Sequence, residues 1–182
     1  MKKQFNHVRK KKMIREATEK DLIEILDIYN DAILNTTAVY TYKPYTLENR
    51  QIWYEQKMAE GYPILVFEQD HKVAGFATFG PFRPSAAYKY SIEHSVYVNK
   101  EYRQMGIGTS LLKELIAIAK DREYMTLVAG IDADNVKSIA MHEKFGFVHS
   151  GTIKKAGYKF NRWLDLAFYH LELGGPKNPS EG

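Results

Sequence analysis

A glycine-rich turn between an alternating segment and an amphipathic segment constrains the fold more than any other feature of this sequence. Residues 91–98 alternate in side-chain character, with Ile92 on one face and Glu93 on the other, as in a β-strand. Glycines then stand at positions 106 and 108. From about Thr109 to Asp121, apolar residues recur at helical spacing. A strand, a glycine turn and a helix in this order predict an α/β or α+β domain.

The turn has the chemistry of an anion site. Glycines let the backbone approach a ligand closely, and the N–H groups at a helix start attract phosphate. Arg103 adds positive charge beside them. A dinucleotide motif needs a third glycine where Leu111 stands, and a P-loop needs a lysine that Gly108-Thr109-Ser110 lacks, so both are excluded. A plain glycine turn before a helix remains an alternative interpretation.

The remaining pattern predicts one domain over residues 13–173, followed by a tail at 174–182. An apolar run at 124–131 predicts a central strand covered on both faces. We expect strands at 14–17, 63–67, 73–79, 91–98, 124–131, 147–153 and 163–173, and helices from Thr18, over 44–61, over 109–121 and from a cap at Asp134 or Asn135.

Charge is distributed unevenly along the chain. The sequence has 26 Lys and Arg against 22 Asp and Glu, a formal net charge of +4. Residues 1–12 contain six basic side chains and no acid, which predicts a basic, disordered N-terminal extension on a slightly acidic domain. A nucleic-acid or membrane-surface arm is the alternative, but Phe5 is the one aromatic residue among its six basic ones, which makes only a weak nucleic-acid footprint. Met13 is also a candidate start site.

Several classes of site are excluded by composition and spacing. The chain has no cysteine, which excludes disulfides, cysteine-based zinc sites, iron–sulfur clusters and a thiol nucleophile. The histidines show no metal-binding spacing, so we expect no metal. No apolar run approaches the ~18 residues of a membrane span, and no signal-peptide pattern is present. We therefore expect a cytoplasmic protein without a membrane or nucleic-acid partner.

The segment Arg103-x-x-Gly106-x-Gly108 resembles the acetyl-CoA loop of the GNAT acetyltransferases. A second segment, from Asn135 through His142 to Gly146-Phe147, resembles their late helix and the turn that follows it. Within this superfamily the chain resembles the phosphinothricin N-acetyltransferase group over residues 13–173. The residues that carry this resemblance are Ile28-Tyr29-Asn30, Thr36-Thr37-Ala38, Trp53, Tyr62-Pro63, Gly75-Phe76-Ala77, Pro81-Phe82-Arg83, Ala87-Tyr88, Ile92 to Val98, and Lys159-Phe160-x-Arg162-Trp163-x-Asp165.

The resemblance implies a mixed, mostly antiparallel sheet flanked by helices, with acetyl-CoA as co-substrate. It assigns the backbone of the late part of strand 91–98 to the pantetheine arm and the glycine turn to the pyrophosphate. Asn135 would both cap its helix and contact the cofactor. The implied cofactor residues are Val96, Tyr97, Val98, Arg103, Gln104, Met105, Gly106, Ile107, Gly108, Thr109, Asn135 and Ser138.

The resemblance also implies two catalytic residues. Glu93 would be the base, because an α-ammonium with a pKa of about 7.7–8.0 must lose a proton before it attacks. A solvated strand glutamate is the alternative. His142 stands where many GNAT members have a tyrosine, and an imidazole can also protonate the leaving thiolate. A surface histidine is the alternative there. The lack of cysteine and of a GxSxG elbow favours direct attack by the amine.

Five further residues are implied at the acceptor. Arg83 and Tyr88 precede Glu93, and an arginine suits a carboxylate or phosphinate. Lys159, Phe160 and Trp163 lie on the late hairpin, which in this family lines the substrate site near a dimer interface; packing is the alternative. Some members have a histidine where Phe160 stands; its absence here counts against phosphinothricin itself as the acceptor and leaves related analogues such as methionine sulfoximine or sulfone open.

These implications together predict a homodimeric N-acetyltransferase that acts in a ternary complex. Its acceptor is the α-amine of a small amino-acid-like molecule. Two alternatives stay open, because a fold does not fix the acceptor. One is acetylation of a protein N-terminus or another amine. The other is a non-catalytic protein that binds an acyl-CoA or associates with nucleic acid through the basic extension.

Overall fold

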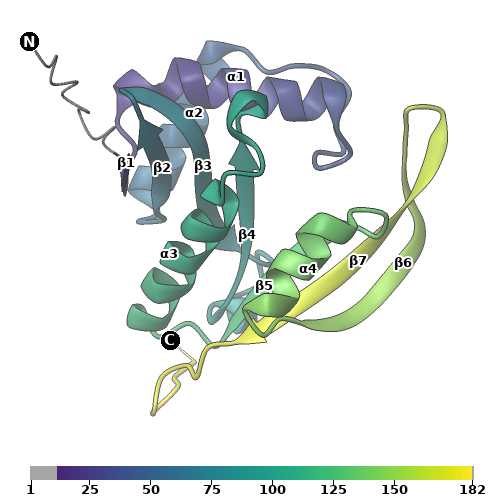
Figure 1. Cartoon of the computed structure of the whole chain (residues 1–182). Helices are drawn as coiled ribbons and strands as arrows, with labels where there is room; N and C mark the ends of the chain where they lie inside the picture. The colour runs from purple at the N-terminus through teal and green to yellow at the C-terminus, as the bar shows by residue number, and fades with distance from the viewer. Residues whose placement is uncertain (1–11, 182) are drawn as a thin grey trace, which may run out of the picture.

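The computed structural model describes residues 12–181, which form a seven-stranded sheet with helices on both faces (Figure 1). Its strand order is β1-β2-β3-β4-β5-β7-β6. The strands are β1 Lys12–Glu16, β2 Ile64–Gln69, β3 Lys72–Pro81, β4 Ser91–Val98, β5 Thr126–Asp132, β6 Val148–Lys159 and β7 Arg162–Glu172. The α-helices are α1 Leu22–Asn35, α2 Leu47–Ala59, α3 Ile107–Asp121 and α4 Val136–Lys144.

The sheet is mixed and mostly antiparallel, as predicted. The parallel pair is β4 with β5, and it is short: its ladder starts at Ser91 opposite Thr126 and ends at Glu93 opposite Val128. Beyond that point β4 continues along β3 as far as Val98, while β5 continues along β7. The two central strands therefore diverge after Glu93, and one edge of β4 faces the opening between them.

Helices cover the two faces of the sheet differently. The cluster around α3 and α4 includes Leu111 and Phe147 and packs on Ile92 of β4. The opposite cluster joins α1 and α2 to the sheet through Ile25 and Phe76. In Figure 1, α3 and α4 lie in front of the strands. Alternation along β4 thus directs successive side chains into two different environments, as the sequence predicted.

Helix α3 begins at Ile107, two residues before the predicted start. Gly106 precedes it with φ +77°, a left-handed conformation that favours glycine. On the sheet below, a Cβ on Gly75 would lie 2.9 Å from the Tyr97 carbonyl oxygen and 3.1 Å from Ile107 Cγ2. A glycine in β3 therefore lets the start of α3 lie close against the sheet.

Helix α2 differs most from its prediction. Its expected apolar positions Leu47, Ile52 and Met58 are exposed, whereas Arg50 is buried. The helix also begins at Leu47 rather than near Pro44, because Thr46 accepts a hydrogen bond from Asn49 N and acts as the cap. A helical period cannot identify which polar residue a tertiary contact will bury.

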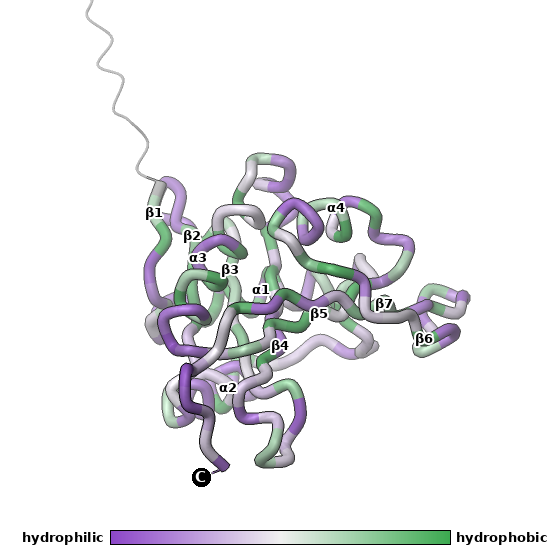
Figure 2. Tube along the Cα trace, turned by 90° about the horizontal axis from the view of Figure 1, so that it is seen from below, coloured by the Kyte–Doolittle hydropathy of each residue, from purple (hydrophilic) through white to green (hydrophobic). Residues whose placement is uncertain are grey.

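The chain ends and the late hairpin complete the fold. Lys12 begins β1, so the predicted basic extension at 1–12 lies outside the described residues except for this one. The β6–β7 hairpin projects from the body of the molecule in both views (Figures 1 and 2). In the C-terminal tail, the backbone N–H of Ser180 donates a hydrogen bond to the Tyr90 hydroxyl.

Within residues 12–181, no helix combines the length and the apolar character that crossing a bilayer requires.

Candidate active site

Three cavities meet where β4 and β5 diverge. The large cavity, of about 790 Å³, lies between the end of β4, the start of α3 and α4. The inner cavity, of about 380 Å³, lies between β4 and β5. The α2 cavity, of about 370 Å³, lies between α2 and the face of β3 and β4. Glu93 lines the inner and α2 cavities, and Tyr97 lines all three.

The large cavity brings the predicted cofactor residues together. Met105 is the exception, since it is not part of this lining and its side chain is exposed. Lys137 and Lys144 line the cavity too, and the sequence reasoning missed both. The predicted residues that line it are Val96, Tyr97, Val98, Arg103, Gln104, Gly106, Ile107, Gly108, Thr109, Asn135 and Ser138.

The start of α3 fits an anionic group. Nothing lies within 4 Å of a Cβ position on Gly106, so the backbone there is open to a ligand. The first N–H groups of a helix lack intrahelical partners and attract negative charge. The charge of Arg103 is partly neutralised, because its Nη2 lies 3.0 Å from Asp31 Oδ2 of α1. Most of the positive potential in the large cavity therefore comes from the backbone N–H groups, Lys137 and Lys144, and only part of it from Arg103.

Glu93 lies at the junction of the inner and α2 cavities. Its side chain is half-buried, and its Oε1 would lie 3.2 Å from a Cβ on Gly130 of β5. Glycine at this position leaves the space that the carboxylate occupies. Burial raises the pKa of Glu93, and the charge of Arg83 opposes that rise. A raised pKa makes the carboxylate a better proton acceptor near neutral pH.

His142 lines the inner cavity, but its ring nitrogens are engaged elsewhere. Its Nδ1 lies 2.7 Å from the Ser138 carbonyl oxygen, which only accepts, so Nδ1 carries a proton and donates it. Its Nε2 lies 3.2 Å from Nε2 of buried His94. Burial lowers the pKa of His142 and lowers the pKa of His94 to about 3. Both rings are therefore neutral at pH 7, and the His142 proton faces Ser138 rather than the cavity.

The predicted acceptor residues before Glu93 lie on the loop from β3 to β4. Arg83 is exposed, donates to the Phe82 carbonyl at 2.8 Å and lies over the Phe82 ring at 4.1 Å. Tyr88 packs edge-on against the same ring, with centroids 5.9 Å apart. Neither residue lines one of the three cavities. The charge of Arg83 nevertheless opposes the rise in the pKa of Glu93.

The late hairpin does not bring its predicted residues into the cavities. Lys159 is buried, and its Nζ donates to the carbonyls of Ile33, Thr36 and Val39. It thus holds the segment after α1, which lines the large and inner cavities through Thr37 and Ala38. Phe160 and Trp163 are 52% and 58% exposed and line none of the three cavities. The acceptor role of these three residues therefore stays a prediction.

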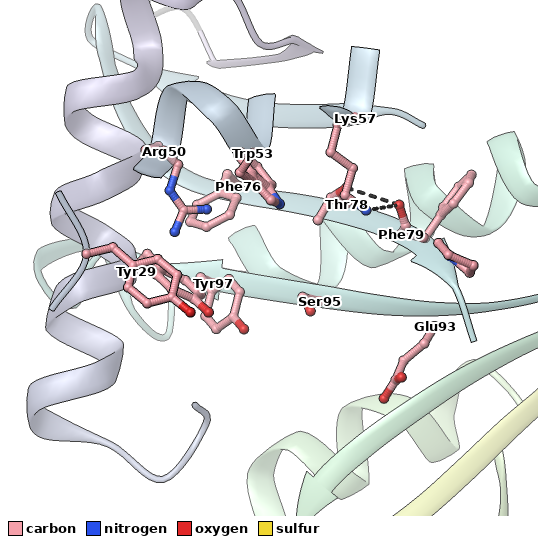
Figure 3. A pocket seen from close by; sticks show the side chains of 13 residues that line it. Tyr29, Arg50, Trp53, Lys57, Phe76, Thr78, Phe79, Glu93, Ser95 and Tyr97 are labelled. Atoms are coloured by element: carbon pink, nitrogen blue, oxygen red, sulfur yellow. Dashed lines mark hydrogen bonds between the residues drawn. The ribbon is translucent and has the colours of Figure 1, made fainter. Parts of the chain in front are cut away.

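The α2 cavity contains residues that sequence reasoning missed. Arg50 and Lys57 from α2 line it with Tyr29 of α1 (Figure 3). Lys57 Nζ donates to the Phe79 carbonyl at 2.7 Å, and burial lowers the pKa of Lys57 to about 8. Polar positions on a helix normally face solvent, so no signal in the sequence distinguished Arg50 and Lys57 from the exposed residues of α2.

Among the residues at 12–181, no group of three or more His, Asp or Glu could hold a metal.

A model of the acetyltransferase (GNAT) family matches residues 24–147, which include β4, the glycine turn, α3 and α4. The chain belongs to the GNAT acetyltransferase family. It is therefore an enzyme that transfers an acetyl group. The open edge of β4 and the start of α3 both border the large cavity of this acetyltransferase.

Relatives of this acetyltransferase share nearly its whole length. The L-methionine sulfoximine/L-methionine sulfone acetyltransferase of Pseudomonas paraeruginosa is 44% identical over 161 residues, 88% of this chain and 94% of the relative. An N-acetyltransferase structure from Staphylococcus aureus Mu50 is 58% identical, with a TM-score of 0.89 over 90% of this chain and 99% of that one. A phosphinothricin acetyltransferase from Sinorhizobium meliloti, solved in complex with AcCoA, is 34% identical, with a TM-score of 0.89 over 94% of both chains.

Proposed function

We propose that this acetyltransferase moves the acetyl group of acetyl-CoA to the α-amine of a small amino-acid-like acceptor of the phosphinothricin or methionine sulfoximine/sulfone type. The position of Glu93 carries the proposal. Its carboxylate borders both the inner and the α2 cavities, next to the large cavity that fits a pyrophosphate-bearing ligand. A base at this junction can serve an amine that approaches from one side and a thioester that approaches from the other.

The residues of the large cavity fit acetyl-CoA. The edge of β4 beyond Glu93 has no ladder partner in β5, so the backbone groups between Val96 and Val98 that do not pair with β3 can bond an amide-containing arm, except that the Val98 carbonyl already accepts from Arg103 Nε. The start of α3, Lys137 and Lys144 suit the phosphates. Acetyl-CoA would supply the acetyl group as its thioester. The relative solved with AcCoA supports this assignment.

Proton balance assigns a task to Glu93. As the amide forms, the carbon–sulfur bond of the thioester breaks and the acceptor ammonium gives up two protons. One proton passes to the Glu93 carboxylate, and the sulfur of the leaving thiolate takes up another. The general-acid role predicted for His142 stays a prediction, although its only proton is directed at Ser138. Direct attack within a ternary complex agrees with a chain that has no cysteine.

The size of the α2 cavity supports a small acceptor. Ligand pockets span about 300–1,000 Å³, and a cavity of about 370 Å³ lies near the low end of that range. A named relative acts on methionine sulfoximine and sulfone, as its name states. Acetylation of such amino-acid analogues would make this an enzyme of resistance to them. We propose that it works in the cytoplasm.

We also propose a homodimer. Phe160 and Trp163 stay exposed at the tip of the β6–β7 hairpin, together with Tyr158, whose ring centroid lies 5.2 Å from that of Trp163. Aromatic side chains of this kind are enriched at protein interfaces. Because the hairpin projects from the body, a second copy of the chain could cover it without distorting the three cavities (Figure 1).

A screen of amine acceptors tests the proposed activity. Purified protein is mixed with acetyl-CoA and with phosphinothricin, methionine sulfoximine, methionine sulfone or a short peptide with a free N-terminus, and free CoA is measured. We expect release with the amino-acid analogues. Release with the peptide alone would replace this proposal with protein N-terminal acetylation. No release with any amine, together with no change in melting temperature on adding acetyl-CoA, would overturn it.

A further inference from the structure

A buried arginine in the α2 cavity has donors that no residue of the described part of the chain satisfies. Arg50 is 3% exposed, and its Nε and Nη2 have no hydrogen-bond partner within residues 12–181. No carboxylate in this range forms an ion pair with it either. An unpaired buried charge typically costs several kcal/mol, and arginine does not avoid this cost by losing its proton. Such an arrangement calls for a ligand.

Three aromatic rings surround the guanidinium. Arg50 Cζ lies 4.2 Å from the Tyr29 ring centroid, 4.4 Å from that of Trp53 and 5.8 Å from that of Tyr45. Cation–π contacts with these rings leave Nε and Nη2 without a hydrogen-bond partner among the described residues. The rings fix the orientation of the group, so its donors are organised before a ligand arrives.

Charge is arranged along the length of the cavity. Figure 3 shows Arg50 at one end and Glu93 at the other, with Tyr97 and Ser95 between them. Among the described residues that line this cavity, Glu93 is the only acid. A ligand with an amine at the Glu93 end and negatively charged oxygens at the Arg50 end would complement both groups.

Lys57 supplies a second cation, at the Glu93 end of the cavity. A Cβ on Gly80 would lie 2.6 Å from Lys57 Nζ, and Gly80 is the ladder partner of Glu93. A carboxylate that is attached to the same carbon as the reacting amine would lie near this ammonium. Arg50 is then left for a second group, carried further along the acceptor side chain.

We propose that Arg50 binds a terminal oxyanion on the acceptor side chain, such as a phosphinate or a second carboxylate, and thereby selects charged acceptors over neutral ones of the same length. The inference rests on the proposed function for the identity of the acceptor amine. It assigns a specificity-determining role to a residue of α2, outside the loop and hairpin that the family resemblance implicates. The planar fork of the guanidinium matches two oxygens of such a group.

Two acceptors of matched shape test this role. Phosphinothricin and methionine sulfone share one carbon skeleton, and differ in carrying a charged phosphinate or a neutral sulfone. We expect Arg50→Met to lower kcat/KM for phosphinothricin about 10- to 100-fold, the range for losing hydrogen bonds to a charged group, mainly through KM. For methionine sulfone we expect a change below about 3-fold. Arg50→Lys should restore part of the phosphinothricin rate.

Controls separate specificity from a folding defect. Arg122→Met removes the same charge from the C-terminal end of α3, where the side chain donates to the Gly61 carbonyl, and should leave the ratio of the two acceptors unchanged. Urea unfolding of each variant reports stability. Equal losses for both acceptors in Arg50→Met, or no loss for phosphinothricin, would overturn the proposal.

A binding measurement distinguishes failure of this inference from failure of the proposed function. The chain has two tryptophans, so a Trp163→Phe background leaves Trp53, next to Arg50, as the reporter. We expect phosphinothricin to change Trp53 fluorescence saturably in this background, and the change to disappear with Arg50→Met even if no acetyl transfer is found. A response that is absent, or that survives Arg50→Met, would remove Arg50 from the subsite.

Discussion

The Nε2 atoms of His94 and His142 lie 3.2 Å apart beneath the opening between β4 and β5, with the two rings within 16° of parallel. Because His142 donates from Nδ1 to Ser138, its Nε2 is the acceptor, and His94 Nε2 is the donor. This fixes both tautomers and leaves His94 Nδ1 as a buried acceptor without a partner in the described residues. The pair is a neutral structural unit next to Glu93.

Acid should destabilise the protein through this pair. The pKa of His94 falls from 6.5 to about 3 on folding, and that of His142 also falls. Below pH 6.5 the unfolded chain binds protons that the native state excludes, so stability is intact above that pH and is lost as pH falls toward 3. The loss for His94 is about 1.4 kcal/mol per pH unit. Urea unfolding at pH 7.5 and pH 5 should show it.

Variants assign this pH dependence to the pair. His94→Gln keeps a donor toward His142 and removes one titrating group, so its stability should vary less between the two pH values. His71, whose side chain is 91% exposed, is the matched control, and His71→Gln should behave as the wild type does. If His94→Gln kept the full pH dependence, the neutral pair would not be its source.

His142→Asn tests the general-acid prediction. The amide nitrogen of asparagine can replace Nδ1 as the donor to the Ser138 carbonyl, but it cannot titrate. Because the His142 proton is directed away from the cavity, we expect kcat to fall less than about 10-fold, below the usual 10²–10⁴ of a general acid. Steady-state kinetics would measure this, and a larger loss with unchanged stability would restore His142 as the proton donor.

Glu93→Gln should abolish most turnover while acetyl-CoA still binds. Loss of a general base typically lowers kcat by about 10²–10⁴. In the wild type, kcat/KM should fall as the carboxylate is protonated, with an acid limb above the ordinary pKa of 4.5 because burial raises the pKa of Glu93. Glu114→Gln, on the exposed side of α3, serves as the matched control. Near wild-type turnover in Glu93→Gln would exclude Glu93 as the base.

Two glycines should affect different kinetic parameters when each is replaced by alanine. A Cβ at position 130 would lie 3.2 Å from Glu93 Oε1, so Gly130→Ala should displace the carboxylate and lower kcat. A Cβ at position 108 would meet Val98, Met141 and Val96 at 3.5–3.8 Å, ordinary contacts on the wall of the large cavity. Gly108→Ala should therefore fold normally and raise KM for acetyl-CoA. The same pattern in both variants would contradict the assignment of these cavities.

Trp163→Lys should convert a dimer into a monomer. The new lysine charge at the exposed aromatic hairpin tip would have to be buried in the proposed interface, at a cost of a few kcal/mol. Sedimentation velocity should show the wild type at twice 21.1 kDa and the variant at 21.1 kDa. Ile23→Lys, at an exposed position on α1, should leave the mass of the wild type. A wild-type monomer would refute the proposal directly.

The local pattern of the sequence was sufficient for the central elements. Alternation in β4 predicted that Glu93 and Tyr97 share a face opposite Ile92, and the structure confirms this because side-chain direction follows the period of a strand. The apolar stripe predicts that α3 starts at about Thr109, two residues after its actual start at Ile107, because Gly106 ends the turn earlier than the stripe suggests. The family resemblance places Lys159 at the acceptor, whereas the contacts of its ammonium in the structure are with the carbonyls of Ile33, Thr36 and Val39, in and just after α1. That contact spans more than a hundred residues, and no local pattern records it.

The strand–glycine–helix unit, the faces of β4 and, through the lack of cysteine, a chemistry without an acyl-cysteine intermediate follow from the residues alone. Tertiary structure decided the rest. The divergence of β4 and β5 at Glu93, the burial of Arg50 under three aromatic rings and the tautomers of His94 and His142 each depend on where separate elements come together. Hydrophobic periodicity fixes which way a residue points on its own element. Which partner it meets is set by strand register and helix docking, which are long-range properties of the packed core.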